Sequence, residues 1–390
     1  MYSLSVSGES PSEIIAHFTE KLKSSDLVTV HLNSEIREVE GYIGQFRVRL
    51  MESGEEKELA AGAIVVATGA REMKPHGLFG YDGKEGIITQ LELEALLKAG
   101  QLQLKDNARV VIISCVGGKE KGNNGDNGAR SYCCRVGCPT IIKNARVISE
   151  LKPDAEVYIL HRDMTLPQKN AEQQRAELQQ RKGVEFIRYS GDKKPEVSEE
   201  LRVTLWDPDT ETRREIDAEL IVLTSPLEPP EDNVSLKEML KLQIGPYDFF
   251  EEALGKLNPL DFVASGVFLC GTAHSPKGVA EAIADGEGAA SRVASVIASP
   301  VMKKEPDISF VVDEKCDGCA YCIDPCPFSA ITLIEYMRED AIKKTVDVNE
   351  AVCKGCGICM ATCPKEGIYV RHYRPRQFLA MVKSALEVTE

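Results

Sequence analysis

Two cysteine runs in the last quarter of the chain have the spacing of iron–sulfur ligands. Each run reads C-x2-C-x2-C-x3-C-P, first from Cys316 to Pro327 and again from Cys353 to Pro364. The second run has the same pattern as the first and begins 37 positions after it, so this region is an internal repeat. In such runs three thiolates surround one [4Fe–4S] cluster, and the cysteine that precedes proline ligates the other cluster.

This exchange of the fourth cysteine predicts two ligand sets. The first set is Cys316, Cys319, Cys322 and Cys363, and the second is Cys353, Cys356, Cys359 and Cys326. Zinc sites use paired C-x2-C units rather than a triple run closed by Cys-Pro, and disulfides need an oxidising compartment. The spacing therefore favours a bacterial-type 2[4Fe–4S] ferredoxin domain.

Composition limits the possible classes of protein. The chain has 390 residues, 43% of them hydrophobic and 28% charged, which favours two or three globular domains. A net charge of -14 makes nucleic acid and anionic membranes poor partners. We expect no membrane insertion and a cytoplasmic location, because the sequence has neither a long apolar stretch nor a signal-peptide pattern. In that compartment thirteen cysteines indicate metal or redox chemistry.

Strand and helix patterns before the ferredoxin repeat predict an α/β fold. We expect an amphipathic helix over residues 11–23, a strand over 27–31 and a helix over 139–151. Residues 63–70 (AIVVATGA) have the pattern of a buried parallel strand that ends in a Thr-Gly turn. Residues 218–225 (AELIVLTS) close a second unit in the same way. The two units predict paired dinucleotide-fold domains of the thioredoxin-reductase type, the first of them incomplete.

The expected domains follow from these patterns and from a proline-rich linker at residues 226–230. They are a partial FAD-binding domain (1–106 and 226–304), a second α/β domain with further cysteines (107–225), the ferredoxin domain (305–372) and a helical tail (373–390).

Four segments, in this order, resemble the A component of heterodisulfide reductase: 64–70, 110–138, 271–290 and the ferredoxin repeat. That family is an iron–sulfur flavoprotein built on a thioredoxin-reductase-like fold, and the resemblance extends over most of the chain from about residue 27. Its most specific part is Ser114-Cys-Val-Gly-Gly followed by Tyr132-Cys-Cys-Arg-Val-Gly-Cys. The resemblance implies a third [4Fe–4S] cluster, and the ligands expected for it are Cys115, Cys133, Cys134 and Cys138.

The third ligand set departs from the family pattern. The family has Tyr-Cys-Ser-Arg-Val-Cys-Cys, whereas this chain has Gly137 where a cysteine is expected and Cys134 where the family has serine. Four thiols remain, one after a buried strand and three at a helix start, where the helix dipole favours thiolates. Zinc, a vicinal disulfide and plain buried thiols are the alternatives.

The resemblance also implies contacts with FAD. Thr68 and Gly69 would turn under the cofactor, and Gly271 and Thr272 would approach its ribityl chain. The next helix would point its N-terminal amides at the isoalloxazine ring, and Lys277 would add a cation near that ring. The residues expected at this helix start are Lys277, Gly278, Val279 and Ala280. The alternative is that the glycines only maintain the fold and the lysine is solvated.

One half of a flavin site has no counterpart in the sequence. The G-x-G-x-x-G turn that holds the pyrophosphate, and the acidic residue that follows it, do not occur in residues 1–26. The chain therefore begins partway into the domain, and we expect a partner chain to supply the other half and to share the FAD. The second unit has cysteines where its own glycine-rich turn would stand, which argues against a nicotinamide site.

The leading hypothesis is an oxidoreductase subunit that is active only within a heterodisulfide-reductase-like complex. It would relay electrons between flavin, [4Fe–4S] clusters and partner subunits, in a manner suited to electron bifurcation or confurcation, and ferredoxin is a further candidate partner. The alternative is a cluster-only relay or scaffold that connects a separate dehydrogenase to an acceptor without a flavin of its own.

Overall fold

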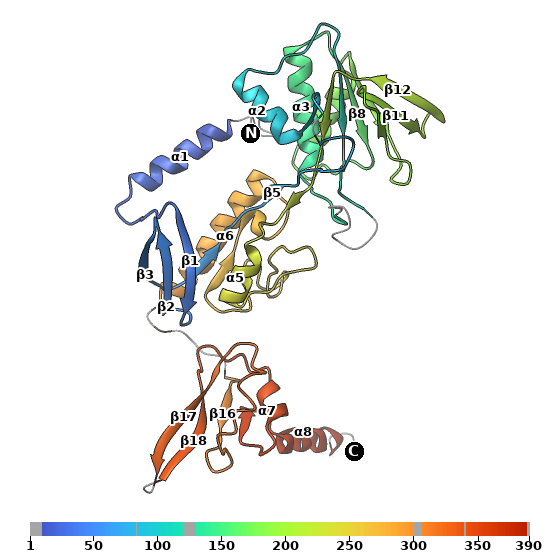
Figure 1. The fold of residues 1–390 in the computed structure, drawn as a ribbon. Coiled ribbons are helices and arrows are strands. Elements are labelled where there is room, and N and C mark those ends of the chain that lie inside the picture. Colours follow the sequence, from blue (N-terminus) through green and yellow to red (C-terminus); the bar gives the residue numbers. More distant parts are fainter. Residues whose placement is uncertain are drawn as a thin grey trace.

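The computed structural model describes residues 10–82, 84–120, 130–299, 301, 306–338 and 341–387. Figure 1 shows two α/β units joined by crossing segments and a smaller lobe at the C-terminal end. The α/β class predicted from the sequence, with two α/β units followed by a C-terminal domain that carries the cysteine runs, is confirmed.

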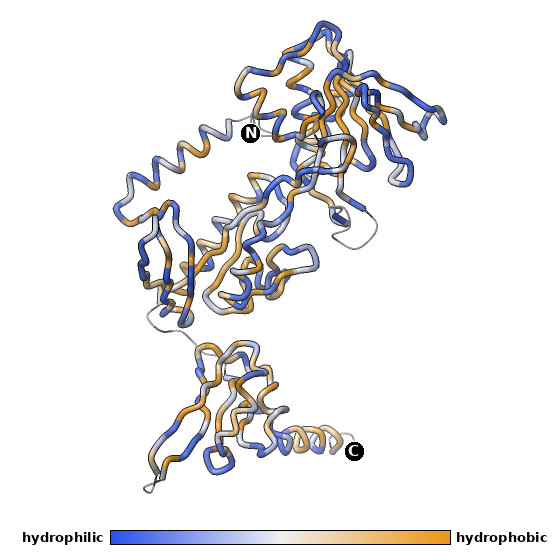
Figure 2. The backbone as a smooth tube through the Cα atoms, in the orientation of Figure 1, coloured by the Kyte–Doolittle hydropathy of each residue, from blue (hydrophilic) through white to orange (hydrophobic). Residues whose placement is uncertain are grey.

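The second α/β unit is built on a five-stranded parallel sheet. The strand order is β6 (Ile87–Thr89), β13 (Leu220–Leu223), β7 (Arg109–Ile113), β8 (Glu156–His161) and β9 (Val184–Arg188). All four apolar residues of β7 are completely buried, as expected for a strand covered on both faces. Figure 2 shows the resulting concentration of hydrophobic residues along these strands.

Different elements cover the two faces of this sheet. One face packs against the helices α2 (Gln90–Ala99), α3 (Gly137–Leu151) and α4 (Ala171–Gln179). The other packs against an antiparallel sheet of β10 (Glu196–Val197), β11 (Arg202–Asp207) and β12 (Thr212–Asp217). This covering leaves the carboxyl ends of the strands as the edge where loops and side chains gather.

The first α/β unit has only two parallel strands, β4 (Ile64–Val66) and β15 (Val267–Leu269). Around them lies an antiparallel meander of three strands, β1 (Ser34–Glu40), β2 (Phe46–Glu52) and β3 (Glu55–Ala61). Two helices, α5 (Asn233–Leu240) and α6 (Val279–Ile297), complete this unit. A short 3₁₀ turn, Gly271–Ala273, lies between β15 and α6. The paired crossing segments β5 (Arg71–Glu72) and β14 (Leu227–Glu228) connect this unit to the larger one.

Of the two predictions for the N-terminal region, a helix and a strand, the first is confirmed and the second is wrong. The helix α1 spans Pro11–Lys23, as predicted. The strand expected over residues 27–31 is wrong, because the chain is irregular there and the first strand begins at Ser34. Its apolar residues Leu27, Val28 and Val30 favour a strand in sequence, but their side chains are 96%, 41% and 58% exposed.

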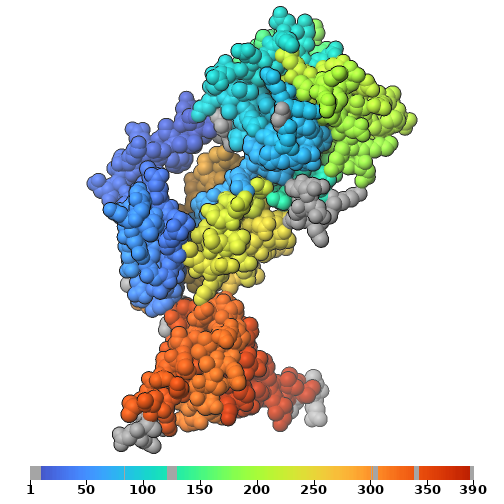
Figure 3. All heavy atoms as spheres, in the orientation of Figure 1, coloured from blue at the N-terminus to red at the C-terminus, as the bar shows by residue number. Residues whose placement is uncertain are grey.

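The C-terminal lobe is a small domain with two antiparallel pairs. These are β16 (Ser309–Val311) with β19 (Ile368–Val370), and β17 (Ile331–Arg338) with β18 (Ala341–Val348). Two helices, α7 (Ile358–Thr362) and α8 (Pro375–Glu387), complete it. Its core combines cysteines with a few aliphatic residues, including Ile331, Val346 and Ile368. Figure 3 shows this lobe as a distinct body below the α/β units.

A buried ion pair joins α2 to α3 beside the large sheet. The Lys143 ammonium pairs with the Glu94 carboxylate, and their side chains are only 2% and 4% exposed. Burial lowers the pKa of Lys143, and the charge of Glu94 opposes that change. A charge in such a place is stabilised mainly by its partner, so removal of one partner leaves the other desolvated.

We therefore predict that Lys143→Met lowers the free energy of unfolding of this unit by ~3 kcal/mol or more. The single tryptophan, Trp206, lies on β11, so its fluorescence during urea unfolding reports this unit. The control is Arg202→Met, which breaks an exposed pair with Asp217 and should cost less than ~1 kcal/mol. Equal effects of the two substitutions would contradict the prediction.

Candidate functional site

Each predicted cysteine set lines a cavity of its own, and the three cavities have similar empty volumes. The first, of about 310 Å³, is lined by Cys115, Cys133, Cys134 and Cys138. The second, of about 320 Å³, is lined by Cys316, Cys319, Cys322 and Cys363. The third, of about 290 Å³, is lined by Cys326, Cys353, Cys356 and Cys359. The last two groupings include the exchange of the fourth cysteine between the runs.

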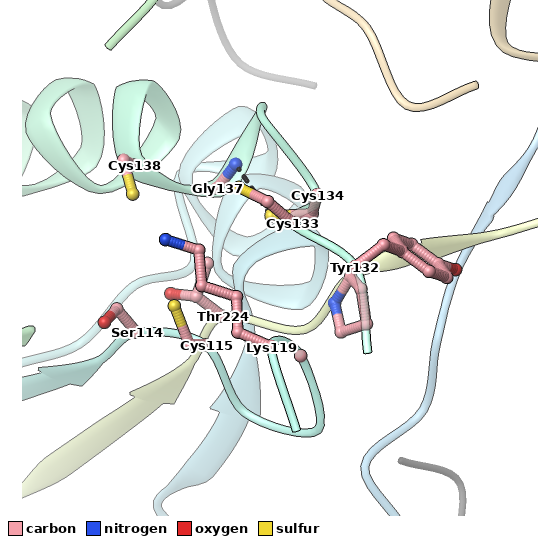
Figure 4. A pocket seen from close by; sticks show the side chains of 11 residues that line it. Ser114, Cys115, Lys119, Tyr132, Cys133, Cys134, Gly137, Cys138 and Thr224 are labelled. Atoms are coloured by element: carbon pink, nitrogen blue, oxygen red, sulfur yellow. Dashed lines mark hydrogen bonds between the residues drawn. The ribbon is translucent and has the colours of Figure 1, made fainter. Parts of the chain in front are cut away.

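The first cavity is assembled at the carboxyl edge of the large sheet. Cys115 follows β7 and has a left-handed backbone, with φ of 54°. Cys133 and Cys134 lie in the loop before α3, and Cys138 is in the first turn of that helix. Figure 4 shows the four sulfurs arranged around a common space, together with Lys119, Ser114 and Thr224.

Close packing at the start of α3 explains why Gly137 has no side chain. A Cβ atom placed there would lie 2.7 Å from Cγ2 of Thr224 and 2.9 Å from Sγ of Cys134. Its backbone N–H donates to that same sulfur, with 3.3 Å between the two atoms. A cysteine at position 137 would therefore collide with Cys134, and the chain carries its thiol at position 134 instead.

Burial favours the neutral form of three thiols in this cavity, those of Cys115, Cys134 and Cys138. Burial raises the pKa of Cys134 to about 12 and that of Cys138 to about 11. Burial also raises the pKa of Cys115, although the nearby Ser114 hydroxyl and the charge of Lys119 oppose it. Metal ligation requires thiolates, so assembly of a cluster here would release protons.

The four thiols fit a cluster better than scattered buried cysteines would. They come from three separate positions in the chain and surround one shared cavity. None of the thirteen cysteines forms a disulfide, so the vicinal-disulfide alternative is not the arrangement seen here. In the part of the chain that the structure describes, no group of His, Cys, Asp and Glu is arranged to hold a single metal ion.

The cysteine loop also touches the first α/β unit. Arg135 donates to the Glu281 carboxylate on α6 over 2.8 Å. The other oxygen of Glu281 accepts the backbone N–H of Gly278, 3.0 Å away, at the start of that helix. On the opposite side, the Tyr132 hydroxyl donates to the Leu227 carbonyl over 2.6 Å. The first cavity therefore lies at the junction between the two units.

The residues expected to contact flavin gather at the carboxyl ends of β4 and β15. Gly69 has φ of 78°, and a Cβ there would lie 3.8 Å from Oγ1 of Thr272. The Thr68 hydroxyl donates to the buried Asn233 side chain over 3.1 Å. The N–H of Gly271 donates to Asp285 over 3.2 Å. Thr68, Gly69, Gly271 and Thr272 are thus brought together.

The residues at the start of α6 make contacts within the chain that the sequence does not predict. The helix begins at Val279, and Ala280 is exposed. Lys277 is 8% exposed and its ammonium pairs with Asp285, so its charge is balanced within the chain. The alternative of a solvated lysine is wrong, because the side chain is buried.

Sequence reasoning missed Arg135, Glu281 and Asp285. Arg135 was visible as the residue after two cysteines in the motif, but its partner lies 146 positions away in the chain. Glu281 and Asp285 are spaced by one helical turn on α6, a spacing that places both on one face. Only the packing of the two units shows what that face contacts.

Comparison with known proteins agrees with the cysteine geometry. A family model described as a 4Fe-4S dicluster domain matches residues 315–366. The iron–sulfur A component of a CoB–CoM heterodisulfide reductase of Methanopyrus kandleri is 35% identical over 349 residues, 85% of this chain and 51% of that protein. The corresponding protein of Methanocaldococcus jannaschii is 34% identical over 357 residues, 88% of this chain and 53% of that protein.

A protein of Archaeoglobus profundus, named for its likeness to the same component, is 32% identical over 314 residues, 73% of this chain and 44% of that protein. Among solved structures, thioredoxin reductase of T. acidophilum aligns with a TM-score of 0.46 and 17% identity, covering 74% of this chain and 81% of that one. The chain spans about half the length of the curated relatives it matches.

These observations define an iron–sulfur protein with a dicluster domain after two α/β units. The resemblance stated from the sequence is confirmed. The chain is a relative of the A component of heterodisulfide reductase over the part of that protein that it spans. Of the described helices, none has the length and apolar character needed to cross a membrane.

We predict that Gly137→Ala disrupts the first cavity, because the added methyl group must displace Cys134 or Thr224. Iron content should fall by about four atoms per chain if that cavity holds one cluster. The matched control is Gly286→Ala in α6, where a Cβ meets no atom within 4 Å. Full iron content in the Gly137→Ala protein would show that the cavity tolerates the change.

Proposed function

We propose that this chain is an electron-transfer subunit of a cytoplasmic, heterodisulfide-reductase-like oxidoreductase complex. It relays electrons between flavin, [4Fe–4S] clusters and partner subunits, and it contributes to electron bifurcation or confurcation. Ferredoxin is a candidate external partner. The similarity to iron–sulfur components of heterodisulfide reductases supports this proposal.

The observation that carries the proposal is the position of the first cavity. Its cysteine loop contacts the start of α6 through Arg135 and Glu281, beside the residues expected to hold the flavin ring. Electron transfer between two cofactors requires that they lie close together within the protein. A cluster in the first cavity would be next to the flavin end of the first α/β unit.

Three cysteine sets hold the clusters in this proposal. The two sets of the C-terminal domain, over residues 305–372, each take three thiolates from one run and one from the other. The third set lies in the second α/β domain, over residues 107–225. When bound, each cluster carries one electron at a time, whereas flavin exchanges two. The chain's residues bind the clusters, keep water away from the buried thiols and fix the distances between centres.

In this proposal the flavin is bound jointly by this chain and by a segment of a partner chain. The sheet of β4 and β15 has two strands only, and Val65 on β4 is 42% exposed. Parallel sheets are normally larger and covered on both faces. Of the 19 residues in α6, only Ala289 is buried. Figure 3 shows an opening between the segment that carries α1 and the body of the molecule.

A strand-and-turn segment from a partner chain would fit this surface. It would pair with the free edge of β4 and complete one sheet across two polypeptides. The partial FAD domain, over residues 1–106 and 226–304, would then provide the ring and ribityl contacts. The partner's glycine-rich turn would hold the pyrophosphate.

We predict about twelve irons per chain in the anaerobically reconstituted protein. Cys115→Ala and Cys138→Ala should each remove about four irons, because each substitution removes one proposed ligand from the first cavity. Cys326→Ala should remove the cluster held mainly by the second run, although it belongs to the first run in sequence. Iron assay and EPR spectra measure these losses.

Cys270→Ala is the matched control for the iron measurements, because Cys270 lines none of the three cavities. Unchanged iron in both Cys115→Ala and Cys138→Ala would remove the third cluster from the proposal. Stoichiometric zinc in the C-terminal domain would contradict the ferredoxin assignment.

We predict that the isolated chain retains clusters but little FAD, whereas the native complex contains it. The reason is that the contacts present here address the ring and ribityl end only. Extraction and quantification of flavin from both preparations is the measurement. Stoichiometric FAD on the lone chain would defeat the shared site, and a flavin-free complex would favour the cluster-only relay.

A further inference from the structure

Ser114 carries a buried hydroxyl that makes no well-formed hydrogen bond at the first cavity. The residue is 1% exposed, lines the cavity, and its Oγ lacks a partner among the described residues. Its main chain is fully used, because its N–H donates to the Leu160 carbonyl and its own carbonyl accepts the Tyr189 hydroxyl. A buried polar atom without a partner is costly, so such an atom beside a cavity points to a ligand of that cavity.

The chemistry of that ligand follows from the neighbouring thiol. Ser114 and Cys115 are neighbours in the chain, and both line the cavity. A serine hydroxyl has one O–H donor, and thiolate sulfurs offer lone pairs that can accept from it. The side chain of Ser114 is therefore suited to donate to sulfur atoms in this cavity.

Thr224 brings a second hydroxyl to the same cavity from the neighbouring strand. It is 3% exposed, and its Oγ1 accepts a hydrogen bond of 3.0 Å from Nε2 of Gln90. The orientation of the Gln90 amide is set by Asn144, which donates to its Oε1 over 2.6 Å. An amide NH₂ can only donate, so Thr224 is the acceptor in this pair.

The hydroxyl hydrogen of Thr224 consequently remains available. Among the described residues, this side chain makes no hydrogen bond besides the one from Gln90, and the sulfurs that line the cavity are its neighbours. Ser114 and Thr224 follow paired positions of β7 and β13, where Ile113 is opposite Leu223. The parallel register therefore places Ser114 and Thr224 side by side at one edge of the cavity.

We propose that Ser114 and Thr224 donate hydrogen bonds to the sulfurs of the third cluster and thereby raise its reduction potential. This inference rests on the proposed cluster in the first cavity. One-electron reduction adds negative charge to the cluster and its sulfurs. Hydrogen bonds to those sulfurs stabilise the reduced form more than the oxidised form. Ser114 and Thr224 act through the cluster and do not themselves react.

The test is a dithionite titration of the intact, cluster-loaded chain monitored by EPR. The signal of the third cluster is identified as the one that Cys115→Ala abolishes. Ser114→Ala and Thr224→Val should each lower the ratio of reduced to oxidised third cluster about tenfold at a fixed potential, a shift of ~59 mV for a one-electron couple. Thr224→Ser keeps the hydroxyl and should retain the wild-type potential.

Ser225→Ala is the matched control. Ser225 is the next residue, it is buried and its Oγ is also without a partner among the described residues, but it does not line the cavity. An unchanged potential in both Ser114→Ala and Thr224→Val, with iron content intact, would overturn the inference alone. An equal shift in Ser225→Ala would overturn it too. If Cys115→Ala removes neither iron nor a signal, the third cluster and this inference fail together.

Discussion

The parallel pairing of β7 with β13 is the constraint on which the first cavity depends. Because the two strands run in the same direction, their carboxyl ends meet at one edge of the sheet. Cys115 follows one strand and Thr224 follows the other, and the amide of Val116 donates to the Thr224 carbonyl over 3.0 Å. A sheet that is buried on both faces holds these ends rigidly. The thiols that come from loops can then be placed against a fixed edge.

The C-terminal domain also has to position cysteines around cavities, but it has a much smaller core with which to do so. Its small core mixes cysteines with about as many aliphatic residues. Burial raises the pKa of Cys322 to about 11, which favours the neutral form of this thiol when no metal is bound. A domain of this size buries little apolar surface. Much of its folding free energy must come from metal ligation, whereas the large sheet of the second α/β unit has an extensive apolar core of its own.

How much could be read from the sequence depended on whether the signal was local. The ferredoxin runs have a fixed spacing, so their grouping into two sets was predicted residue by residue. Helix α1 was also predicted, but the strand expected over residues 27–31 was wrong. Its apolar side chains needed a neighbouring surface, and periodicity does not report whether one exists. The ion pair of Arg135 with Glu281 could not be predicted, because it depends on how two units pack.

That same ion pair joins the cysteine loop to the first α/β unit. Arg135 has a left-handed backbone with φ of 56°, which turns the chain between Cys134 and α3 and directs the guanidinium to α6. Glu281 receives this charge with one oxygen and caps the start of α6 with the other. The helix start and the cysteine loop are consequently held by a single carboxylate. A shift of the cysteine loop would alter the end of α6 nearest the expected flavin ring. The cysteine loop and the start of α6 are therefore connected through this carboxylate.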